Sequence, residues 1–136
     1  YAEIDRRDGA LRLVQAGHPH PLIQRADGRL TRLGAGGMPV GLIEGAGWQT
    51  VEDRLDPGDR LLLVSDGVIE CPDPEGLELG QEGLERLLQE RADLRGQALI
   101  ESLIWELARW SGSEDFPDDV SLALLEYDGL PAGPGD

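Results

Sequence analysis

Three aspartates stand where this chain could bind a divalent cation. Asp66 follows, after one serine, a run of four apolar residues (61–64) that is typical of a strand buried on both faces. Asp118 and Asp119 open a second apolar stretch, residues 120–127. If the two strands are antiparallel neighbours, the end of one lies beside the start of the other and the carboxylates meet at one rim of a sheet. Carboxylate oxygens suit Mg²⁺ and Mn²⁺, and without a cation they would repel one another.

Both acidic segments also have simpler interpretations. Asp66 and Gly67 form one of the commonest turn dipeptides. Asp118 and Asp119 could form a turn or a cap. Spacing alone leaves the choice between these alternatives and a cation site open.

The composition limits the classes of function. The chain has 136 residues, which suits one domain, and 40% are hydrophobic, which is enough for a core. It carries 27 acidic against 12 basic residues, for a net charge of −15, and every basic residue is arginine. Such a surface disfavours nucleic acid and anionic membranes, and it favours cations, basic partners or simple solubility.

The elements that would position the aspartates form an α+β pattern. A meander of short strands joined by tight turns comes first, then an alternating strand, the buried strand, a polar loop, two helices and a last strand. We predict strands at 1–5, 11–16, 22–25, 30–33, 48–53, 61–64 and 120–127, a loop at 68–78, and helices at 81–92 and 97–110. No domain boundary is expected before about Asp128, and residues 129–136 are predicted to be a disordered tail or linker.

Several other features have an ordinary structural interpretation. The glycine-rich stretch 34–47 lacks a GxxxxGK[ST] pattern, so we interpret it as a connector that holds a short apolar anchor at 38–42. Trp105 and Trp110 could form an aromatic ligand site, but helical spacing favours core packing. Cys71, the single cysteine, excludes an intrachain disulfide and is expected to be a small core residue rather than a reactive thiol.

The chain offers no run of ~20 apolar residues to cross a membrane and no signal peptide. Together with the cysteine usage, this predicts a cytoplasmic protein, or the cytosolic part of something larger.

Four motifs in register closely resemble the SpoIIE/RsbU-like branch of the PPM (PP2C-type) metal-dependent serine/threonine phosphatases. The resemblance covers residues from about Tyr1 to Tyr127. The motifs are Ala16-Gly17-His18-Pro19, Gly37-Met38-Pro39-Val40-Gly41-Leu42, Pro57 to Glu70 with its central Ser65-Asp66-Gly67, and Asp118-Asp119-Val120-Ser121.

The resemblance implies an α-β-β-α sandwich of antiparallel sheets with a pair of Mn²⁺ or Mg²⁺ ions at its rim. Asp66 would be a catalytic ligand of one ion and Asp118 of the other, while Asp119 would be a further ligand or a supporting residue. The implied reaction is metal-assisted hydrolysis, in which the ions clamp the phosphate and activate a water for in-line attack. His18 could be a general acid, but its motif is interpreted as structural, shaping a hairpin corner.

The family has an N-terminal half that these residues do not match, including a strand whose aspartate bridges both metals. We therefore expect residues 1–128 to be the C-terminal part of a phosphatase domain, with little or no activity alone. The resemblance implies a phosphorylated anti-sigma-factor antagonist (a STAS-domain protein) as substrate and an upstream sensor or receiver domain as regulator. Two alternatives remain: a non-catalytic phosphatase-like module that binds a partner, and a small acidic cation-binding domain of unrelated fold.

Overall fold

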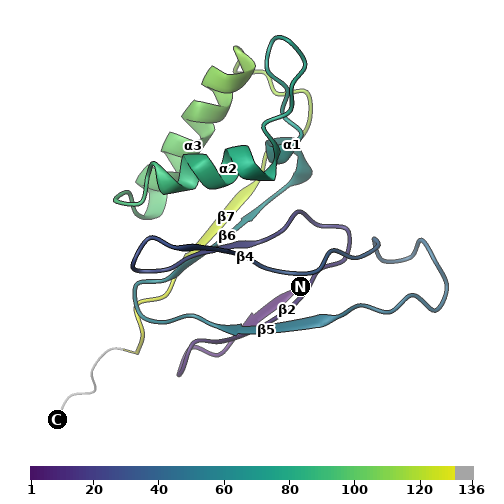
Figure 1. The fold of residues 1–136 in the computed structure, drawn as a ribbon, viewed down its shortest axis with the longest axis vertical. Helices are drawn as coiled ribbons and strands as arrows, with labels where there is room; N and C mark the ends of the chain where they lie inside the picture. Colours follow the sequence, from purple (N-terminus) through teal and green to yellow (C-terminus); the bar gives the residue numbers. More distant parts are fainter. Residues whose placement is uncertain (131–136) are drawn as a thin grey trace. The chain divides into compact units, whose positions relative to one another are not determined.

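The computed structural model describes residues 1–130, and its chain divides into two compact units (Figure 1). Among the described residues, unit 1 contains 1–61 and 125–130, and unit 2 contains 62–124. Most of the tail predicted at 129–136 lies outside the described residues.

Unit 1 contains the predicted meander. Its strands are β1 (Ala2–Ile4), β2 (Ala10–Val14), β3 (Leu22–Gln24), β4 (Leu30–Arg32) and β5 (Thr50–Arg54). Strands β1, β2 and β5 form an antiparallel sheet in that order, with Leu13 opposite both Ala2 and Val51. Leu11 and Leu13 are buried while Ala10 and Arg12 are exposed, which is the alternation expected of a sheet with one covered face.

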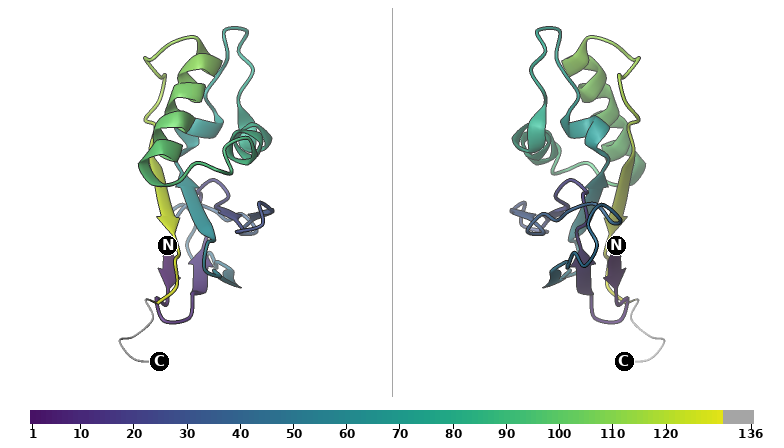
Figure 2. Two further views of the ribbon diagram at one scale, coloured as in Figure 1. Left: turned by 90° about the vertical axis from the view of Figure 1, so that its left-hand side faces the viewer. Right: turned by 90° about the vertical axis from the view of Figure 1, so that its right-hand side faces the viewer.

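A second sheet has the strand order β4-β3-β6-β7, where β6 is Arg60–Val64 and β7 is Leu122–Glu126. Strands β6 and β7 lie next to each other in Figures 1 and 2. They are antiparallel, because the Tyr127 amide donates to the Asp59 carbonyl at 2.9 Å and the Ser65 amide donates to the Ser121 carbonyl at 2.9 Å. Nearly all of β6 is buried, as its apolar run predicts. The expected α+β fold with antiparallel sheets is confirmed.

Unit 2 contains three helices: α1 (Asp66–Ile69), α2 (Gly80–Gln89) and α3 (Gly96–Ser111). The two long helices match the predicted spans, and each buries one leucine stripe: Leu84 and Leu88 on α2, and Leu99, Leu103 and Leu107 on α3. Gly112 ends α3 with a φ of 70°, a left-handed conformation that glycine adopts without a Cβ clash.

The loop predicted at 68–78 is wrong at its start. Asp66 to Ile69 form one helical turn, closed by a hydrogen bond of 2.8 Å from the Glu70 amide to the Asp66 carbonyl. The apolar Val68 drives this turn, because its side chain is only 2% exposed and lies in the core of the unit.

The apolar anchor predicted at 38–42 is also wrong. Val40 is 75% exposed and Leu42 66%, so these side chains do not anchor the connector in a core. The connector is fixed through its backbone instead, since Trp48 Nε1 donates to the Met38 carbonyl at 2.7 Å and the Gly17 amide to the Gly37 carbonyl at 2.9 Å. Among the described residues, this connector contains no helix and no strand of its own.

The two tryptophans of α3 behave differently. Trp105 is 59% exposed, so its predicted core packing is wrong: it stands two residues, about 200°, from the buried Leu103 and Leu107. Arg109 covers its ring at 4.9 Å from the centroid. Trp110 is half-buried and its Nε1 donates to the Cys71 carbonyl at 3.0 Å. Cys71 is a buried core residue, as predicted, and burial raises the pKa of its thiol.

Within residues 1–130, no helix has the length and hydropathy needed to cross a membrane.

Candidate functional site

The two acidic segments singled out in the sequence meet in unit 2. Ser65, just after β6, pairs with Ser121, just before β7, because the Ser65 amide donates to the Ser121 carbonyl. Gly67 lies against the backbone of the other segment: a Cβ built on it would stand 3.0 Å from the carbonyl carbon of Asp119, and closer still to the oxygen. The backbones that carry Asp66 and Asp119 are therefore in direct contact, and this contact requires glycine at position 67.

Ser65 adds a side-chain link between the same segments. Its Oγ donates to the Asp119 carbonyl at 2.8 Å and accepts from the Ser121 amide at 2.9 Å. The sequence analysis placed Ser65 in a family motif but assigned it no role. Its position could have indicated one, because a polar residue at the end of a buried strand immediately precedes a candidate ligand.

The three carboxylates are exposed and carry no arginine partner. Asp66 Oδ1 accepts from the Gly67 amide at 3.0 Å, and Asp118 Oδ1 accepts from the Asp119 amide at 2.7 Å. Throughout residues 1–130, no ion pair involves Asp66, Asp118 or Asp119. Neighbouring backbone amides thus engage one oxygen of Asp66 and one of Asp118, and the other oxygen of each is open to solvent.

This donor set fits a hard divalent cation in its chemistry but supplies few ligands. Mg²⁺ typically takes one or two carboxylates and keeps several of its waters, which open oxygens on two adjoining segments can accommodate. However, the described part of the chain contains no group of three or more His, Cys, Asp or Glu side chains arranged to hold a metal ion. Asp66, Asp118 and Asp119 would thus hold a cation only together with water or other ligands.

The two histidines belong to unit 1 and contact backbone carbonyls. His18 Nδ1 lies 2.9 Å from the Pro19 carbonyl oxygen, and the His18 carbonyl accepts from Gln15 Nε2 at 2.6 Å. His20 Nδ1 lies 2.8 Å from the Leu33 carbonyl oxygen. These contacts agree with a structural role for His18 at the corner after β2.

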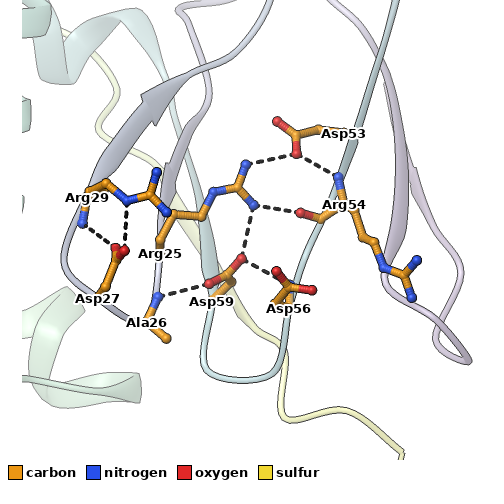
Figure 3. Close-up of polar contacts among 8 residues, drawn as sticks. All are labelled: Arg25, Ala26, Asp27, Arg29, Asp53, Arg54, Asp56 and Asp59. Atoms are coloured by element: carbon orange, nitrogen blue, oxygen red, sulfur yellow. Dashed lines mark hydrogen bonds and ion pairs between the residues drawn. The ribbon is translucent and has the colours of Figure 1, made fainter.

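A second group of aspartates lies in unit 1 and was not predicted from the sequence. Arg25 points between Asp53 and Asp59, and we call these three residues the Arg25 cluster (Figure 3). Arg25 Nη2 donates to Asp53 Oδ1 at 2.8 Å. Arg25 Nη1 donates to Asp59 Oδ2 at 3.0 Å and to the Arg54 carbonyl at 2.6 Å. Desolvation alone would lower the pKa of the guanidinium, but the hydrogen bonds and charges of the two carboxylates together raise it.

Asp59 is the buried member of the Arg25 cluster, with a side chain 3% exposed. It also accepts from the Ala26 amide at 2.9 Å and the Asp56 amide at 3.0 Å. It closes a type II turn, in which Gly58 takes a φ of 95° and the Asp59 amide donates to the Asp56 carbonyl at 2.9 Å. Every contact of this carboxylate serves the fold of unit 1.

Sequence comparison finds two similar proteins in Bacillus subtilis. The chain is 25% identical over 125 residues to stage II sporulation protein E of Bacillus subtilis, covering 92% of this chain and 15% of that protein. It is 27% identical over 128 residues to the phosphoserine phosphatase RsbU of Bacillus subtilis, covering 92% of this chain and 37% of that protein. The chain thus spans well under half the length of these curated relatives.

Structural comparison confirms the PP2C-like fold. The crystallised PP2C phosphatase domain of SpoIIE from Bacillus subtilis, with a fragment of its regulatory domain, superposes with a TM-score of 0.78 at 24% identity. The match covers 96% of this chain and 37% of that one. The model of the family described as stage II sporulation protein E (SpoIIE) matches residues 1–128. The resemblance drawn from the four motifs is therefore confirmed, and the chain belongs to the SpoIIE family.

Proposed function

We propose that this chain is part of a metal-dependent protein phosphatase that hydrolyses phosphoserine or phosphothreonine on a regulatory protein. The observation that carries the proposal is the contact between two segments that bear exposed carboxylates, Ser65–Gly67 and Asp118–Asp119. Family membership over residues 1–128 supports it, as does a relative named as a phosphoserine phosphatase.

Asp66 and Asp118 would hold the cation, and Asp119 would bind it or support its neighbour. When bound, a divalent ion such as Mn²⁺ or Mg²⁺ supplies Lewis-acid stabilisation to a phosphoryl group. The residues of the chain do the positioning: β6 and α1 fix Asp66, and the contact at Gly67 brings the Asp118–Asp119 segment to it. Exposure of the carboxylates leaves room for a phosphorylated side chain of another protein.

The test replaces Asp66 with Asn in the full-length protein that carries this sequence. We expect Mn²⁺-dependent hydrolysis of a phosphoserine peptide to fall at least a hundredfold, while the circular dichroism spectrum stays that of the wild type. Asp27→Asn is the matched control, because Asp27 is an exposed aspartate of unit 1 that pairs with Arg29. Hydrolysis that survives Asp66→Asn at the level of the control would refute a catalytic role for this site.

A non-catalytic, partner-binding module is the second candidate. It is favoured by one observation, that residues 1–130 gather no three metal-binding side chains in one place. In that case the wild-type full-length protein would release no phosphate with Mn²⁺ or Mg²⁺, whichever phosphopeptide is offered.

Because residues 1–130 gather no three metal-binding side chains, we also propose that residues 1–136 alone turn over phosphopeptides slowly or not at all. The expected substrate is a phosphorylated anti-sigma-factor antagonist of the STAS type, with regulation by an upstream sensor or receiver domain. Comparing phosphate release by residues 1–136 and by the full-length protein, with a phosphorylated STAS protein as substrate, tests both statements. Equal rates would contradict the first, and rates no better than with an unrelated phosphopeptide would contradict the second.

A further inference from the structure

We infer that Ser65 is a positioning residue of the cation site: its hydroxyl fixes the Asp118–Asp119 segment to the end of β6, so that one site includes both segments. The inference rests on the proposed function, because it assigns Ser65 to the binding of the cation.

The hydroxyl of Ser65 is used in both directions. A serine hydroxyl offers one proton and accepting lone pairs. Here the proton goes to the Asp119 carbonyl at 2.8 Å, and a lone pair receives the Ser121 amide at 2.9 Å. With the backbone bond from the Ser65 amide to the Ser121 carbonyl at 2.9 Å, this one residue makes three hydrogen bonds to residues 119–121.

Helix capping does not account for this serine. Ser65 occupies the N-cap position of α1 with an extended backbone, φ −71° and ψ 163°, where a serine side chain typically accepts from an amide of the first turn. It makes no such cap bond. The hydroxyl is turned away from its own helix and toward the segment that carries the other candidate ligands.

The two sides of the site need different amounts of support. Asp66 starts a helix directly after a buried strand, so its backbone is fixed. Residues 113–121 have no regular structure, and their own hydrogen bonds are local, such as the Asp115 amide to Ser113 Oγ at 3.0 Å. Within the described chain, the hydrogen bonds that join 113–121 to other elements are those of Ser65 and two with Ser111 at the end of α3. Ser111 Oγ donates to the Ser113 carbonyl and accepts from the Ser113 amide.

The link is placed next to the ligands. Ser65 precedes Asp66, and its proton acceptor is the carbonyl of Asp119 itself. The Asp119 amide is held at the other end by Asp118 Oδ1 at 2.7 Å. Losing the hydroxyl would therefore free the Asp118–Asp119 peptide relative to Asp66. Groups that orient metal ligands typically contribute tenfold or more to affinity.

The experiment measures Mn²⁺ affinity, by the electron paramagnetic resonance signal of free Mn²⁺, in the full-length protein and its variants. Ser65→Ala should raise the Kd roughly tenfold. Ser65→Thr keeps the hydroxyl and should retain most of the wild-type affinity for Mn²⁺. Ser65→Val, whose side chain has the shape of threonine without the hydroxyl, should not. At saturating Mn²⁺ the phosphatase rate of Ser65→Ala should return toward wild type, because the hydroxyl positions ligands and does not touch substrate.

Ser113→Ala is the matched control, since it deletes another hydroxyl–amide bond in the same segment without touching β6. Its Kd should equal that of the wild type. Wild-type affinity in Ser65→Ala, or an equal loss in Ser113→Ala, would overturn this inference and leave the proposed function standing. If Ser65→Ala does not fold, equal affinities of the Thr and Val variants overturn it. A wild-type protein that binds no Mn²⁺ would overturn the proposed function together with this inference.

Discussion

Strand β6 has an aspartate at each end, and the two are treated in opposite ways. Asp59, just before the strand, is buried and accepts from Arg25 and from two backbone amides. Asp66, just after it, is exposed and accepts only from the amide of the next residue, among the donors that the structure describes. A buried carboxylate with a paired cation and filled lone pairs holds a fold together, whereas an exposed one without a cation is available to a ligand.

The comparison separates two uses of acidic residues in a chain with a net charge of −15. Position along the sequence hardly distinguishes Asp59 from Asp66: Asp59 directly precedes the strand, Asp66 follows it after one serine, and each is next to a glycine. The difference lies in what surrounds the side chain. Changes that remove each carboxylate should therefore act on different measured quantities.

Removing Asp59 should have the largest effect on stability. Asp59→Ala leaves Arg25 partly buried without one of its two anionic partners and strips the acceptor from two amides. Breaking a buried pair in this way typically costs roughly 3–5 kcal/mol of unfolding free energy. Urea denaturation measures the loss, and Asp27→Ala, which removes an exposed ion pair with Arg29, should change the unfolding free energy far less. Equal losses in the two variants would remove the distinction between buried and exposed pairs.

Gly67→Ala should have the next largest effect. The added Cβ would press on the Asp119 carbonyl, so the backbone of one segment must shift, at roughly 1–3 kcal/mol. Gly47→Ala is the control, because Gly47 has open space around it and no positive φ. Denaturation curves of both variants, with Mn²⁺ titrations, should show lost stability and weaker binding for Gly67→Ala alone. Unchanged binding in that variant would show that the close approach is not needed by the site.

Asp118→Asn should hardly change the stability of the metal-free protein. Its side chain is exposed and bonds only to the next amide, so we expect a change within about 0.5 kcal/mol. What should be lost is the rise in Tm on adding Mn²⁺, since a ligand stabilises only the state that binds it. Differential scanning calorimetry with and without Mn²⁺ gives both quantities. A metal-free loss as large as that of Asp59→Ala would make Asp118 a structural residue.

The smallest effect concerns an exposed ion pair in the first hairpin. Side-chain and backbone hydrogen bonds from Arg7 lower the pKa of Asp5 from its ordinary 3.8 to about 2. Because the folded pKa is the lower one, the stability that this pair contributes is present above pH 3.8 and is lost as the pH falls through 2. Arg7→Ala should return the pKa toward 3.8 in a carbon-13 NMR titration. The stability of Arg7→Ala near neutral pH should stay nearly unchanged, unlike that of Asp59→Ala. If the pKa of Asp5 stays near 2 in Arg7→Ala, Arg7 is not the cause of the lowered pKa.

The elements with a periodic pattern of apolar residues could be predicted from the sequence. Alternation and leucine spacing indicated the meander, β6, α2 and α3, because burial on one face imposes a period. The apolar runs before Asp66 and after Asp119 indicated two strands, but their pairing was only a condition of the cation-site hypothesis, and the hydrogen bonds of the structure show it. We expected Trp105 in the core from its helical spacing, but its side chain lies about 200° around α3 from the buried Leu103 and Leu107. The apolar residues at 38–42 were expected to anchor the connector, whereas only its backbone is held.

The contacts between distant side chains could not be predicted in this way. Arg25 meets Asp59 across 34 positions, and the chain offers 12 arginines and 27 acidic residues from which to choose. No periodic pattern in the sequence indicates which arginine pairs with which carboxylate. Similarly, Ser65 reaches Asp119 across 54 positions, and only the pairing of β6 with β7 brings the two together.

The three tryptophans give the molecule separate optical reporters. Trp105 stands in solvent on α3, Trp110 is tied to the Cys71 carbonyl in the same unit, and Trp48 is tied to the glycine-rich connector of unit 1. An aqueous quencher such as iodide should extinguish the emission of Trp105 first. Once Trp105 is replaced by Phe, the remaining fluorescence would follow the loosening of each unit through a different indole.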